Sequence, residues 1–313
     1  MVHSIENSEI ISRYKSKTDY MQTSLGPYII GILSALAATV LFGVTNVIYR
    51  KIDNEISVLD IAITRIWISL PLSFLFAATA IGSVNFAIPS EAVLPLGISM
   101  IIGIIIGDTM YFLSQERIGV ARAFPITMSY PLVVYLMAAI ILEEPVILQR
   151  IIGAFTVIIG VVFIARAKQS DMPNETQRWN ARDRRIGFAL AFLTILAWAV
   201  GDIIFQVGLI TTEAAEANFF RLLVASIILI PVFMISLRGN RKLPSRRISS
   251  IALIAGLFGI GFSLIGYSYA VKLVGATVTS ILVASAPMIT APLSAVYLNE
   301  DVNKYVAFGT LFT

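Results

Sequence analysis

The 313-residue sequence contains no cysteine and a single histidine, His3. Without cysteine the chain forms no disulfide and no thiolate metal site, and one histidine in a polar tail excludes histidine-cluster metal sites and histidine-based catalysis. Phosphate-cradling glycine loops and nucleophile elbows are also missing. We therefore expect no metal, no cofactor and no chemistry on a covalent bond, and we predict that the protein is not an enzyme.

Charge is scarce too, since only 13% of the residues are charged whereas 57% are hydrophobic. This apolar fraction exceeds what a soluble core of this length could bury. A membrane-spanning helix needs about 20 mostly apolar residues, and ten segments meet or approach that length. The composition therefore predicts an all-α integral membrane protein that crosses the cell membrane many times.

The ten predicted helices form two sets of five. They are expected near residues 27–49, 59–80, 92–114, 118–142 and 148–167, and near 186–210, 215–237, 248–271, 274–298 and from 304 onward. The last segment is shorter than its counterpart in the first half, so we expect a truncated tenth helix. The predicted parts are a polar tail (1–26), a first repeat (27–167), a polar linker (168–185) and a second, C-terminally truncated repeat (186–313).

The two halves repeat one another when the sequence is shifted by 156 residues. The landmark pairs are Gly31 with Gly187, Phe42 with Trp198, Asn46 with Asp202, Asp60 with Glu216, Arg65 with Arg221, Pro131 with Pro287, Glu144 with Glu300 and Gly153 with Gly309. Because each half holds an odd number of helices, the second half must enter the bilayer upside down. The pattern predicts two inverted five-helix repeats, an arrangement typical of transporters.

A polar and aromatic stripe marks the sixth predicted helix. Trp198, Asp202 and Gln206 repeat at four-residue spacing, which places them on one helical face. The mirrored stripe on the first helix is Phe42, Asn46 and Arg50. We expect the two stripes to line a substrate cavity between the repeats, the alternative for Asn46 and Asp202 being a polar bond between helices.

Ionised groups inside a span are costly unless they face a partner or a watery cavity. Asp108 and Asp202 are therefore candidates for binding a coupling proton or cation. For Asp108, whose mirror position is Leu264, a salt bridge to an arginine is the alternative. Arg65 and Arg221 lie near helix ends, where they could gate the pathway or clamp substrate, or simply anchor the helices by extending to the interface.

Two further mirrored pairs lie within predicted spans. Pro131 and Pro287 are predicted to kink their helices and free the carbonyls of Thr127 and Val283, and they serve as hinges unless they reflect only the abundance of proline in membrane helices. Tyr111 and Tyr267 lie near helix ends, a position typical of the aromatic belt at the membrane interface.

The chain resembles the drug/metabolite transporter superfamily, in its ten-helix branch with two tandem EamA domains. The resemblance rests on Arg65 and Arg221, on YSYAVKLVGATVTSILVASAPMITAPLSAVYLNEDV (267–303), and on its weaker twin YFLSQERIGVARAFPITMSYPLVVYLMAAIILEEPV (111–146). A glutamate closes each stretch before a glycine-containing fifth helix such as IIGAFTVIIGVVF. The likeness covers about residues 27–313, and the first-half twin departs from the family in carrying Arg122.

The resemblance implies transport of small metabolites by alternating access around a cavity lined by both repeats, commonly driven by ion or substrate gradients. The expected cargo is an amino-acid-like, nucleoside-like or drug-like solute. A membrane receptor or scaffold that transports nothing is the alternative function. The expected partners are this solute, the bilayer and a coupling proton or cation, and the protein is expected to be a monomer or homodimer.

Basic residues set the orientation. They account for the net charge of +4 and lie in short loops beside helix ends, which favours lipid contact over nucleic-acid binding. They are concentrated on the face opposite the N-terminal tail, so the positive-inside rule predicts that the tail lies outside the cytoplasm. The family resemblance implies the reverse, and both orientations stay open.

Overall fold

The computed structural model describes residues 25–52, 55–82, 86–118, 123, 126–170, 180–237 and 244–298. Its helices are α2 (Leu25–Ile52), α3 (Val58–Ile81), α4 (Ser90–Ser99), η1 (Met100–Gly107), α5 (Asp108–Ile118), α7 (Tyr130–Ile141), α8 (Leu148–Ser170), α10 (Ala181–Gly208), α11 (Ala214–Leu237), α12 (Arg246–Gly256), η2 (Leu257–Phe262), α13 (Ser263–Ala284) and α14 (Pro287–Leu298). No strand occurs in these residues, which confirms the predicted all-α fold. Residues 1–24 of the predicted tail, residues 171–179 of the linker, the tenth helix and Glu300 lie outside the described residues.

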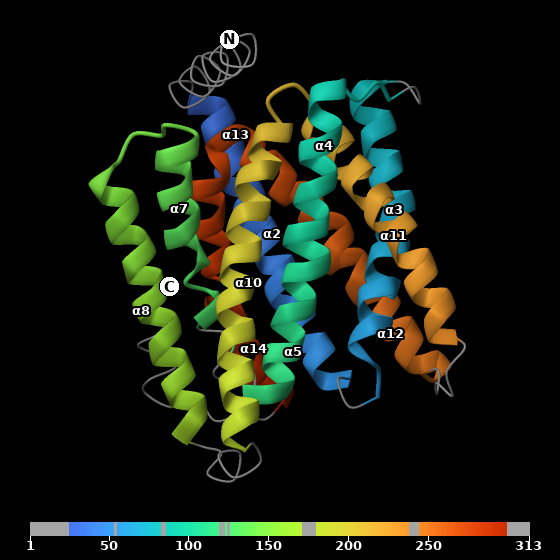
Figure 1. Ribbon diagram of the computed structural model, residues 1–313, viewed down its shortest axis with the longest axis vertical. Coiled ribbons are helices and arrows are strands. Elements are labelled where there is room, and N and C mark those ends of the chain that lie inside the picture. The colour runs from blue at the N-terminus through green and yellow to red at the C-terminus, as the bar shows by residue number, and fades with distance from the viewer. Residues whose placement is uncertain are drawn as a thin grey trace.

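The helices form a bundle of upright, mostly antiparallel rods (Figure 1). Six described stretches are long and apolar enough to cross a membrane, and two shorter apolar helices, Tyr130–Ile141 and Leu148–Gly160, accompany them. The longest stretch, Arg246–Thr290, is interrupted at Gly275, whose backbone is not helical, so it makes two passes. The described residues therefore cross the bundle nine times. The predicted boundaries of the two repeats and their linker stay predictions.

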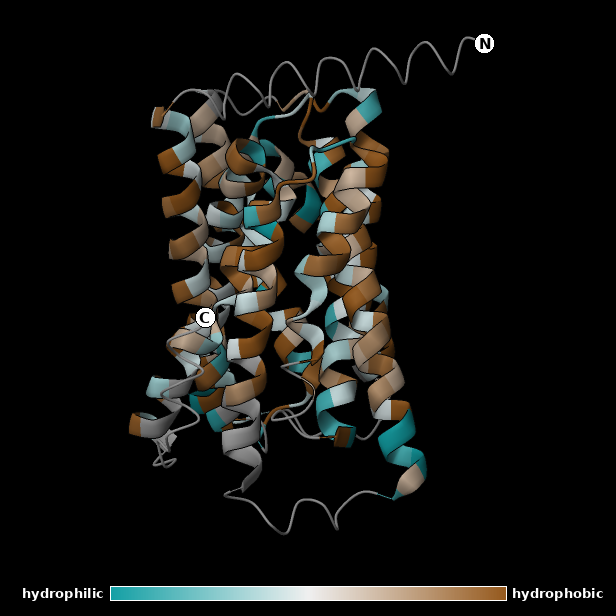
Figure 2. Ribbon diagram, turned by 90° about the vertical axis from the view of Figure 1, so that its left-hand side faces the viewer, coloured by the Kyte–Doolittle hydropathy of each residue, from teal (hydrophilic) through white to brown (hydrophobic). Residues whose placement is uncertain are grey.

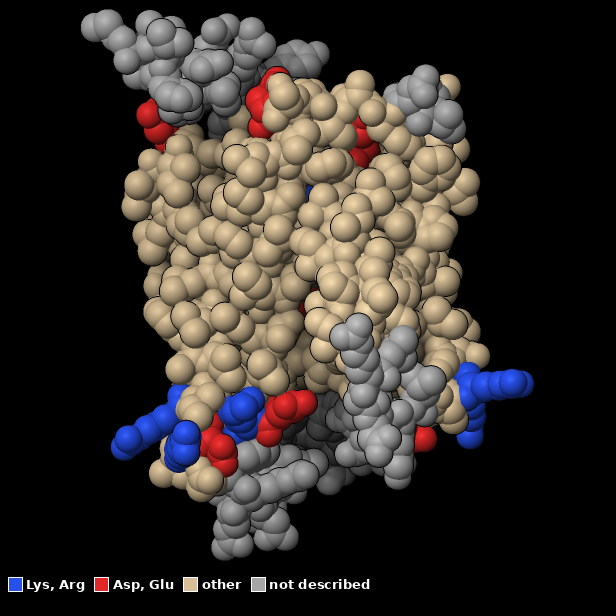
Figure 3. Space-filling view, turned by 45° about the vertical axis from the view of Figure 1, so that its right-hand side comes forward, with Lys and Arg blue, Asp and Glu red and all other residues tan. Residues whose placement is uncertain are grey.

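The outer surface is apolar. Hydrophobic residues cover the sides of the bundle (Figure 2), and large side chains such as Leu33, Leu94, Ile140 and Val296 point outward. Figure 3 shows the charged groups at the two ends and an almost uncharged face between them. A band of this kind faces hydrocarbon, and the chain is a multi-pass membrane protein.

Basic side chains gather at the end of the bundle where α10 and α12 begin (Figure 3). Those described at this end include Lys51, Arg117, Arg182, Arg184, Arg185, Arg246 and Arg247. Helix α2 starts at the opposite end (Figure 1). The positive-inside rule therefore predicts that the start of α2 faces away from the cytoplasm.

Each repeat packs its first helix against the other repeat. Gly31 of α2 lies against Val274 of α13, so closely that a methyl group at Gly31 would overlap the valine. Gly187 of α10 lies in the same way against Ile118 of α5. Both members of one pair lie 156 residues from members of the other pair, with the halves exchanged. This reciprocity is what a two-fold axis between inverted repeats produces.

Polar caps define where several helices begin. Ser57 accepts a hydrogen bond from the Asp60 amide at 3.1 Å at the start of α3, and Asn180 accepts one from the Asp183 amide at 2.8 Å at the start of α10. Ser245 does the same for α12. These side chains satisfy amides that have no partner within the helix. The beginnings of the helices thus follow local sequence signals.

Helices four and nine are not continuous, contrary to the expectation of single helices over 118–142 and 274–298. Ser129 and Ser285 mark turns, and in each case the helix resumes around the proline two residues later, Pro131 or Pro287. Each serine donates its amide and its hydroxyl to the carbonyl three residues earlier, with hydroxyl distances of 2.6 Å in both turns. A proline is well placed in the first turn of a helix, where no amide partner is needed.

The carbonyl of Val283, expected to be freed by Pro287, instead accepts the Ala286 amide at 3.0 Å. The backbone therefore tightens into a turn rather than leaving this oxygen without a partner. The neighbouring Leu282 carbonyl also accepts the Thr39 hydroxyl of α2, at 3.3 Å. The break is thus tied to the first helix, and the hinge role of the two prolines stays a prediction.

Helices three and eight each contain a π-helical segment at mirrored positions, η1 and η2. Glycines in these segments admit close neighbours. Gly103 of η1 faces Gly201 of α10, where a methyl group on Gly201 would lie 2.7 Å from the Gly103 Cα. The two backbones are therefore in direct contact at this crossing, and Asp108, the first residue after η1, is positioned by it.

We predict that Gly201→Ala lowers the free energy of unfolding by about 1–3 kcal/mol, because the added methyl meets backbone atoms that cannot move aside. Gly153→Ala is the matched control, since a methyl there meets nothing within 4 Å and alanine is the better helix former. Thermal unfolding of the purified proteins measures both effects. Equal melting temperatures for the two variants would contradict the close contact.

Candidate functional site

An ion pair lies inside the bundle between the second and third helices. Arg65 Nη2 of α3 donates to Asp108 Oδ2 of α5 at 2.5 Å, and Trp198 Nε1 of α10 donates to the other carboxylate oxygen, Oδ1, at 2.9 Å. Arg65 is only 5% exposed. Both oxygens of Asp108 are therefore engaged, one by a cation and one by an indole.

Aromatic rings enclose this ion pair. The Arg65 guanidinium lies 5.4 Å from the ring centre of Phe112, within the range of a cation–π interaction. The Trp198 ring contacts those of Tyr111 and Tyr130, with centroid separations of 5.2 and 5.6 Å. The rings lower the local polarity, which strengthens the attraction between the two charges.

A second cluster surrounds the mirrored arginine. The Arg221 guanidinium of α11 lies 3.7 Å from the centre of the Phe205 ring, and Phe205 in turn stacks on Tyr267 of α13 at 6.4 Å. The Asp202 carboxylate of α10 lies near Tyr267 and attracts Arg221. Arginine, tyrosine and aspartate are thus held together on an aromatic support.

Several buried polar atoms of this second cluster have no hydrogen-bond partner. They are Nε and Nη1 of Arg221 and Oδ2 of Asp202. Arg221 is 3% exposed. A buried cation and a buried carboxylate oxygen with unused hydrogen-bonding capacity are energetically unfavourable unless something else binds them. Nε of Arg65 is buried without a partner too, but the Arg65 guanidinium is paired with Asp108, whereas Arg221 has no such ion pair among the described residues.

The inverted repeats put the two clusters at different depths. Arg65 lies in the second turn of α3 and Arg221 in the second turn of α11, and these helices pack side by side from opposite ends (Figure 1). Trp198 joins the clusters, because it bonds Asp108 and lies one helical turn from Asp202 on α10. The interior between the repeats is therefore lined by both.

The structure places the predicted stripe of α10 on three different contacts. Trp198 meets Asp108, Asp202 meets Tyr267, and the Gln206 amide nitrogen donates to Glu144 Oε1 at 3.1 Å. On the first helix, Phe42 and Asn46 are half-buried. The Asn46 amide nitrogen is buried without a hydrogen-bond partner. The side chain of Arg50 lies outside the described residues.

For Asp108 the structure has the salt bridge that the sequence left as an alternative to an ion site. Extension of Arg65 and Arg221 to the interface does not occur, because both residues are buried beside a carboxylate. The aromatic-belt interpretation of Tyr111 and Tyr267 is wrong as well. Tyr111 is 4% exposed, and both rings pack against interior aromatic side chains.

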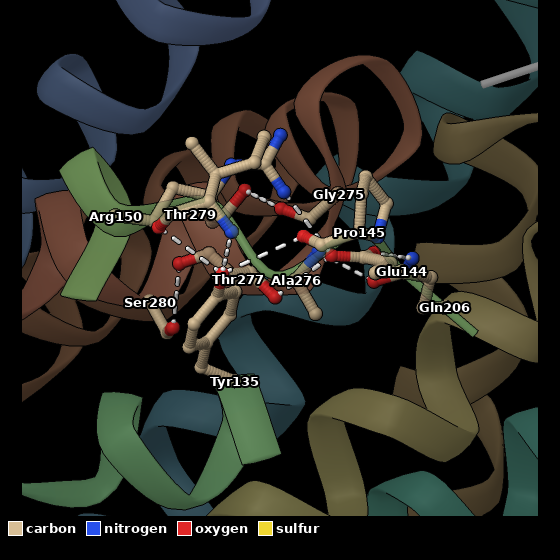
Figure 4. Close-up of polar contacts among 11 residues, drawn as sticks. Tyr135, Glu144, Pro145, Arg150, Gln206, Gly275, Ala276, Thr277, Thr279 and Ser280 are labelled. Atoms are coloured by element: carbon tan, nitrogen blue, oxygen red, sulfur yellow. Dashed lines mark hydrogen bonds and ion pairs between the residues drawn. The ribbon is translucent and has the colours of Figure 1, made fainter. Parts of the chain in front are cut away.

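A polar network around Glu144 ties together the end of the bundle where α7 and α10 finish (Figure 4). Glu144 Oε2 accepts the Thr277 hydroxyl at 3.1 Å and faces Arg150 Nη1 at 3.4 Å, while Oε1 accepts the Gln206 amide. Gln206 Oε1 in turn accepts the Ala276 amide at 2.5 Å. One carboxylate thus joins helices of both repeats.

The backbone conformation at Gly275 allows this network to form. Its φ of 82° and ψ of 163° interrupt the helix between the eighth and ninth passes, a conformation that glycine adopts at little cost. The interruption leaves the Ala276 amide available to Gln206. Across the network, the Ile147 amide donates to the Tyr135 hydroxyl at 2.5 Å, which holds the loop that carries Glu144.

Tyr267, Glu144 and, apart from Gln206, the partners of Glu144 were not identified from the sequence as site residues. The mirrored pairs Tyr111 with Tyr267 and Glu144 with Glu300 carried the only signal. Pairing between residues as distant as Glu144 and Thr277 depends on helix packing, which local patterns do not specify.

Known proteins match most of the chain. The profile of the EamA-like transporter family matches residues 29–166 and again residues 185–313. The chain belongs to this EamA-like transporter family. A protein described as an uncharacterised transporter of Archaeoglobus fulgidus is 24% identical over 280 residues, which cover 89% of this chain and 93% of that one. A solved crystal structure superposes with a TM-score of 0.73 at 16% identity, covering 90% of this chain and 94% of the other, and shows the fold alone.

Membership of the EamA-like family supports a transporter role in general and favours a carrier over an enzyme. The two profile matches fall one on each half of the sequence repeat. The Arg65 and Arg221 clusters therefore occupy equivalent positions in two EamA-like domains.

We predict that Asp108→Asn lowers the free energy of unfolding by about 3 kcal/mol, because it leaves the buried Arg65 without a counterion. The double variant Arg65→Leu with Asp108→Asn should recover part of the loss. The matched control is Glu213→Gln, because the Glu213 carboxylate is 69% exposed, lies 3.5 Å from Lys272 and should contribute less than about 1 kcal/mol where water screens it. Thermal unfolding measures all three, and additive losses in the double variant would argue against coupling.

Proposed function

We propose that the chain is a secondary transporter that moves a small solute by alternating access between its two inverted repeats. The observation that carries the proposal is the group of buried, unpartnered polar atoms on Asp202, Arg221 and Asn46, inside a bundle whose outer surface is apolar. Family membership supports the general role.

These buried polar groups are energetically costly. A charged or amide group in a lipid-facing bundle is retained against a cost of several kcal/mol only where a ligand or a watery path compensates for it. Phe42, Asn46, Trp198, Asp202 and Gln206 are the proposed lining of that path. A receptor or scaffold requires no such interior polar surface.

The two aspartates receive different roles in this proposal. Asp108 is held between Arg65 and Trp198 and acts as a fixed counter-charge. Asp202 retains a free buried oxygen and is the group proposed to bind the coupling proton or cation, or a polar group of the cargo. Arg65 and Arg221 set the charge balance at their respective depths.

The Glu144 network is the proposed closure of one end of the pathway. It joins the ends of α7 and α10 to the turn at Gly275, so opening this end requires that its hydrogen bonds be broken. The turns before Pro131 and Pro287 are proposed as the points where helices four and nine bend during that change.

We predict that Asp202→Asn abolishes concentration of the solute against its gradient in proteoliposomes with an imposed proton or sodium gradient, because the neutral amide cannot alternate between charged and neutralised states. A panel of amino acids, nucleosides, sugars and lipophilic cations provides the solutes. Glu213→Gln is the control for loss of one carboxylate outside the bundle interior. Wild type and Asp202→Asn behaving identically would remove Asp202 from the mechanism, and a wild type that moves no solute would favour the receptor or scaffold.

Glu144→Gln is predicted to open the closed end more often, because the charge-assisted bonds to Thr277 and Arg150 are weakened. The sequence has no native cysteine, so a single Ile281→Cys below the network can report access by its rate of labelling with a water-soluble maleimide. We expect roughly a tenfold faster rate. The neighbouring carboxylate Glu143, changed to Gln, serves as the control, and unchanged labelling in Glu144→Gln would refute the closure.

A further inference from the structure

The two mirrored arginines are in different states. Arg65 donates to Asp108 at 2.5 Å, so its charge is directly paired. Arg221 stacks on Phe205 at 3.7 Å, and its Nε and Nη1 are buried without a partner. Stacking on a ring holds the plane of a guanidinium while leaving its edge donors available. Nε of Arg65 is also buried without a partner, but Asp108 already balances the charge of Arg65, so Arg221 has the larger capacity for an incoming anion.

The nearest acid does not use that capacity. The Asp202 carboxylate attracts Arg221 and lies near Tyr267, yet its Oδ2 atom is buried and unpartnered. Arg221 donors and an Asp202 acceptor therefore remain available within one cluster. A ligand that presents an anionic group to the first and a hydrogen-bond donor to the second would satisfy both.

The charge of the cluster limits the kind of anion. Arg221 contributes one positive charge and the adjacent Asp202 opposes any further negative charge. A dianion such as a phosphomonoester would be repelled by the aspartate, whereas a carboxylate matches the single guanidinium and its planar donors. Phe205, Tyr267 and Trp198 provide the apolar surroundings for the remaining atoms of a small organic acid.

We propose that the cargo is a small carboxylic acid bearing an amino or hydroxyl group, with its carboxylate bound by Arg221 and its donor bound by Asp202. This inference rests on the proposed transporter function and concerns the same interior region. It identifies Arg221 as the residue that selects the anion, and Asp202 as the residue that distinguishes an amino acid or hydroxy acid from a plain carboxylic acid.

The test is thermal stabilisation of the purified, detergent-solubilised protein by matched sets of solutes, since a ligand that prefers the folded state raises the melting temperature. Each set contains an amino acid, the hydroxy acid and plain acid of the same skeleton, and the amide in which the carboxylate is neutralised. We expect at least one amino or hydroxy acid to bind about tenfold or more tightly than its amide. Stronger binding by amides, amines or phosphomonoesters, or by no carboxylate at all, would overturn the inference.

Variants assign the two roles. Arg221→Gln should abolish the preference for the acid over its amide, and Arg221→Lys should keep the preference with weaker binding, because the charge remains and the planar donors are lost. Asp202→Asn should reduce the preference for an amino acid over the plain acid. Arg185→Gln, which removes an exposed positive charge at the end of the bundle, is the control. Unaltered acid selectivity in Arg221→Gln would overturn the assignment.

Failure of the inference and failure of the proposed function give different results. If neutral or cationic solutes are bound and carried across proteoliposomes while carboxylates are not, the transporter function holds and the substrate class is wrong. If carboxylates bind with the predicted dependence on Arg221 but no solute crosses the membrane, the binding site is correct and the transporter function fails.

Discussion

Inside a lipid-facing bundle a charge must find its compensation within the protein, because the surrounding hydrocarbon supplies neither water nor counterions. The interior of this chain is organised by that constraint. Asp108 is positioned by the π-helical segment before it, so that its carboxylate meets Arg65 and Trp198 from two other helices. Asp202, Arg221 and Asn46 depart from this rule, because each has buried polar atoms without a hydrogen-bond partner.

The inverted repeats share a backbone arrangement, but the buried arginine of each repeat lies beside an acid from a different helix. Each second helix carries an arginine in its second turn, but the acid beside Arg65 comes from the third helix of its repeat, whereas the acid beside Arg221 comes from the sixth helix of the chain. Asn46 stands where the first repeat would otherwise have the equivalent of Asp202. A symmetric backbone with an asymmetric interior allows one repeat to be fixed while the other interacts with a ligand.

Sequence reasoning predicted the parts of the fold that depend on apolar length, on capping residues and on the repeat. The extents of α3 and α11 lie within two residues of the predicted ranges because charge or turn residues bound them. It did not predict the turns at Ser129 and Ser285. A serine can remain within a continuous helix, or its hydroxyl can bond to a nearby carbonyl where the helix breaks, and a neighbouring proline is compatible with both structures.

For the site, the sequence pointed to the ionisable residues but not to their partners. An ion site and a salt bridge were both open for Asp108, and only the approach of the Arg65 side chain in the assembled bundle decides for the salt bridge. Tyr111 and Tyr267 were misplaced because distance from a helix end is a poor measure of depth where helices are long and tilted. Glu144 meets Thr277 and Gln206 across long stretches of chain, so its network follows from the assembled bundle alone.

The exchange of Gly31 and Gly187 between repeats bears on biogenesis. Helix α2 leaves the ribosome before the other described helices, yet the surface that receives Gly31 lies on α13, which is synthesised more than two hundred residues later. Until the second half is synthesised, the face of α2 that contacts α13 has no packing partner in the bilayer. Contacts between segments so distant along the chain slow folding. Completion of this protein is consequently a late, cooperative event, and the first half is the stage at which quality control has the longest opportunity to act.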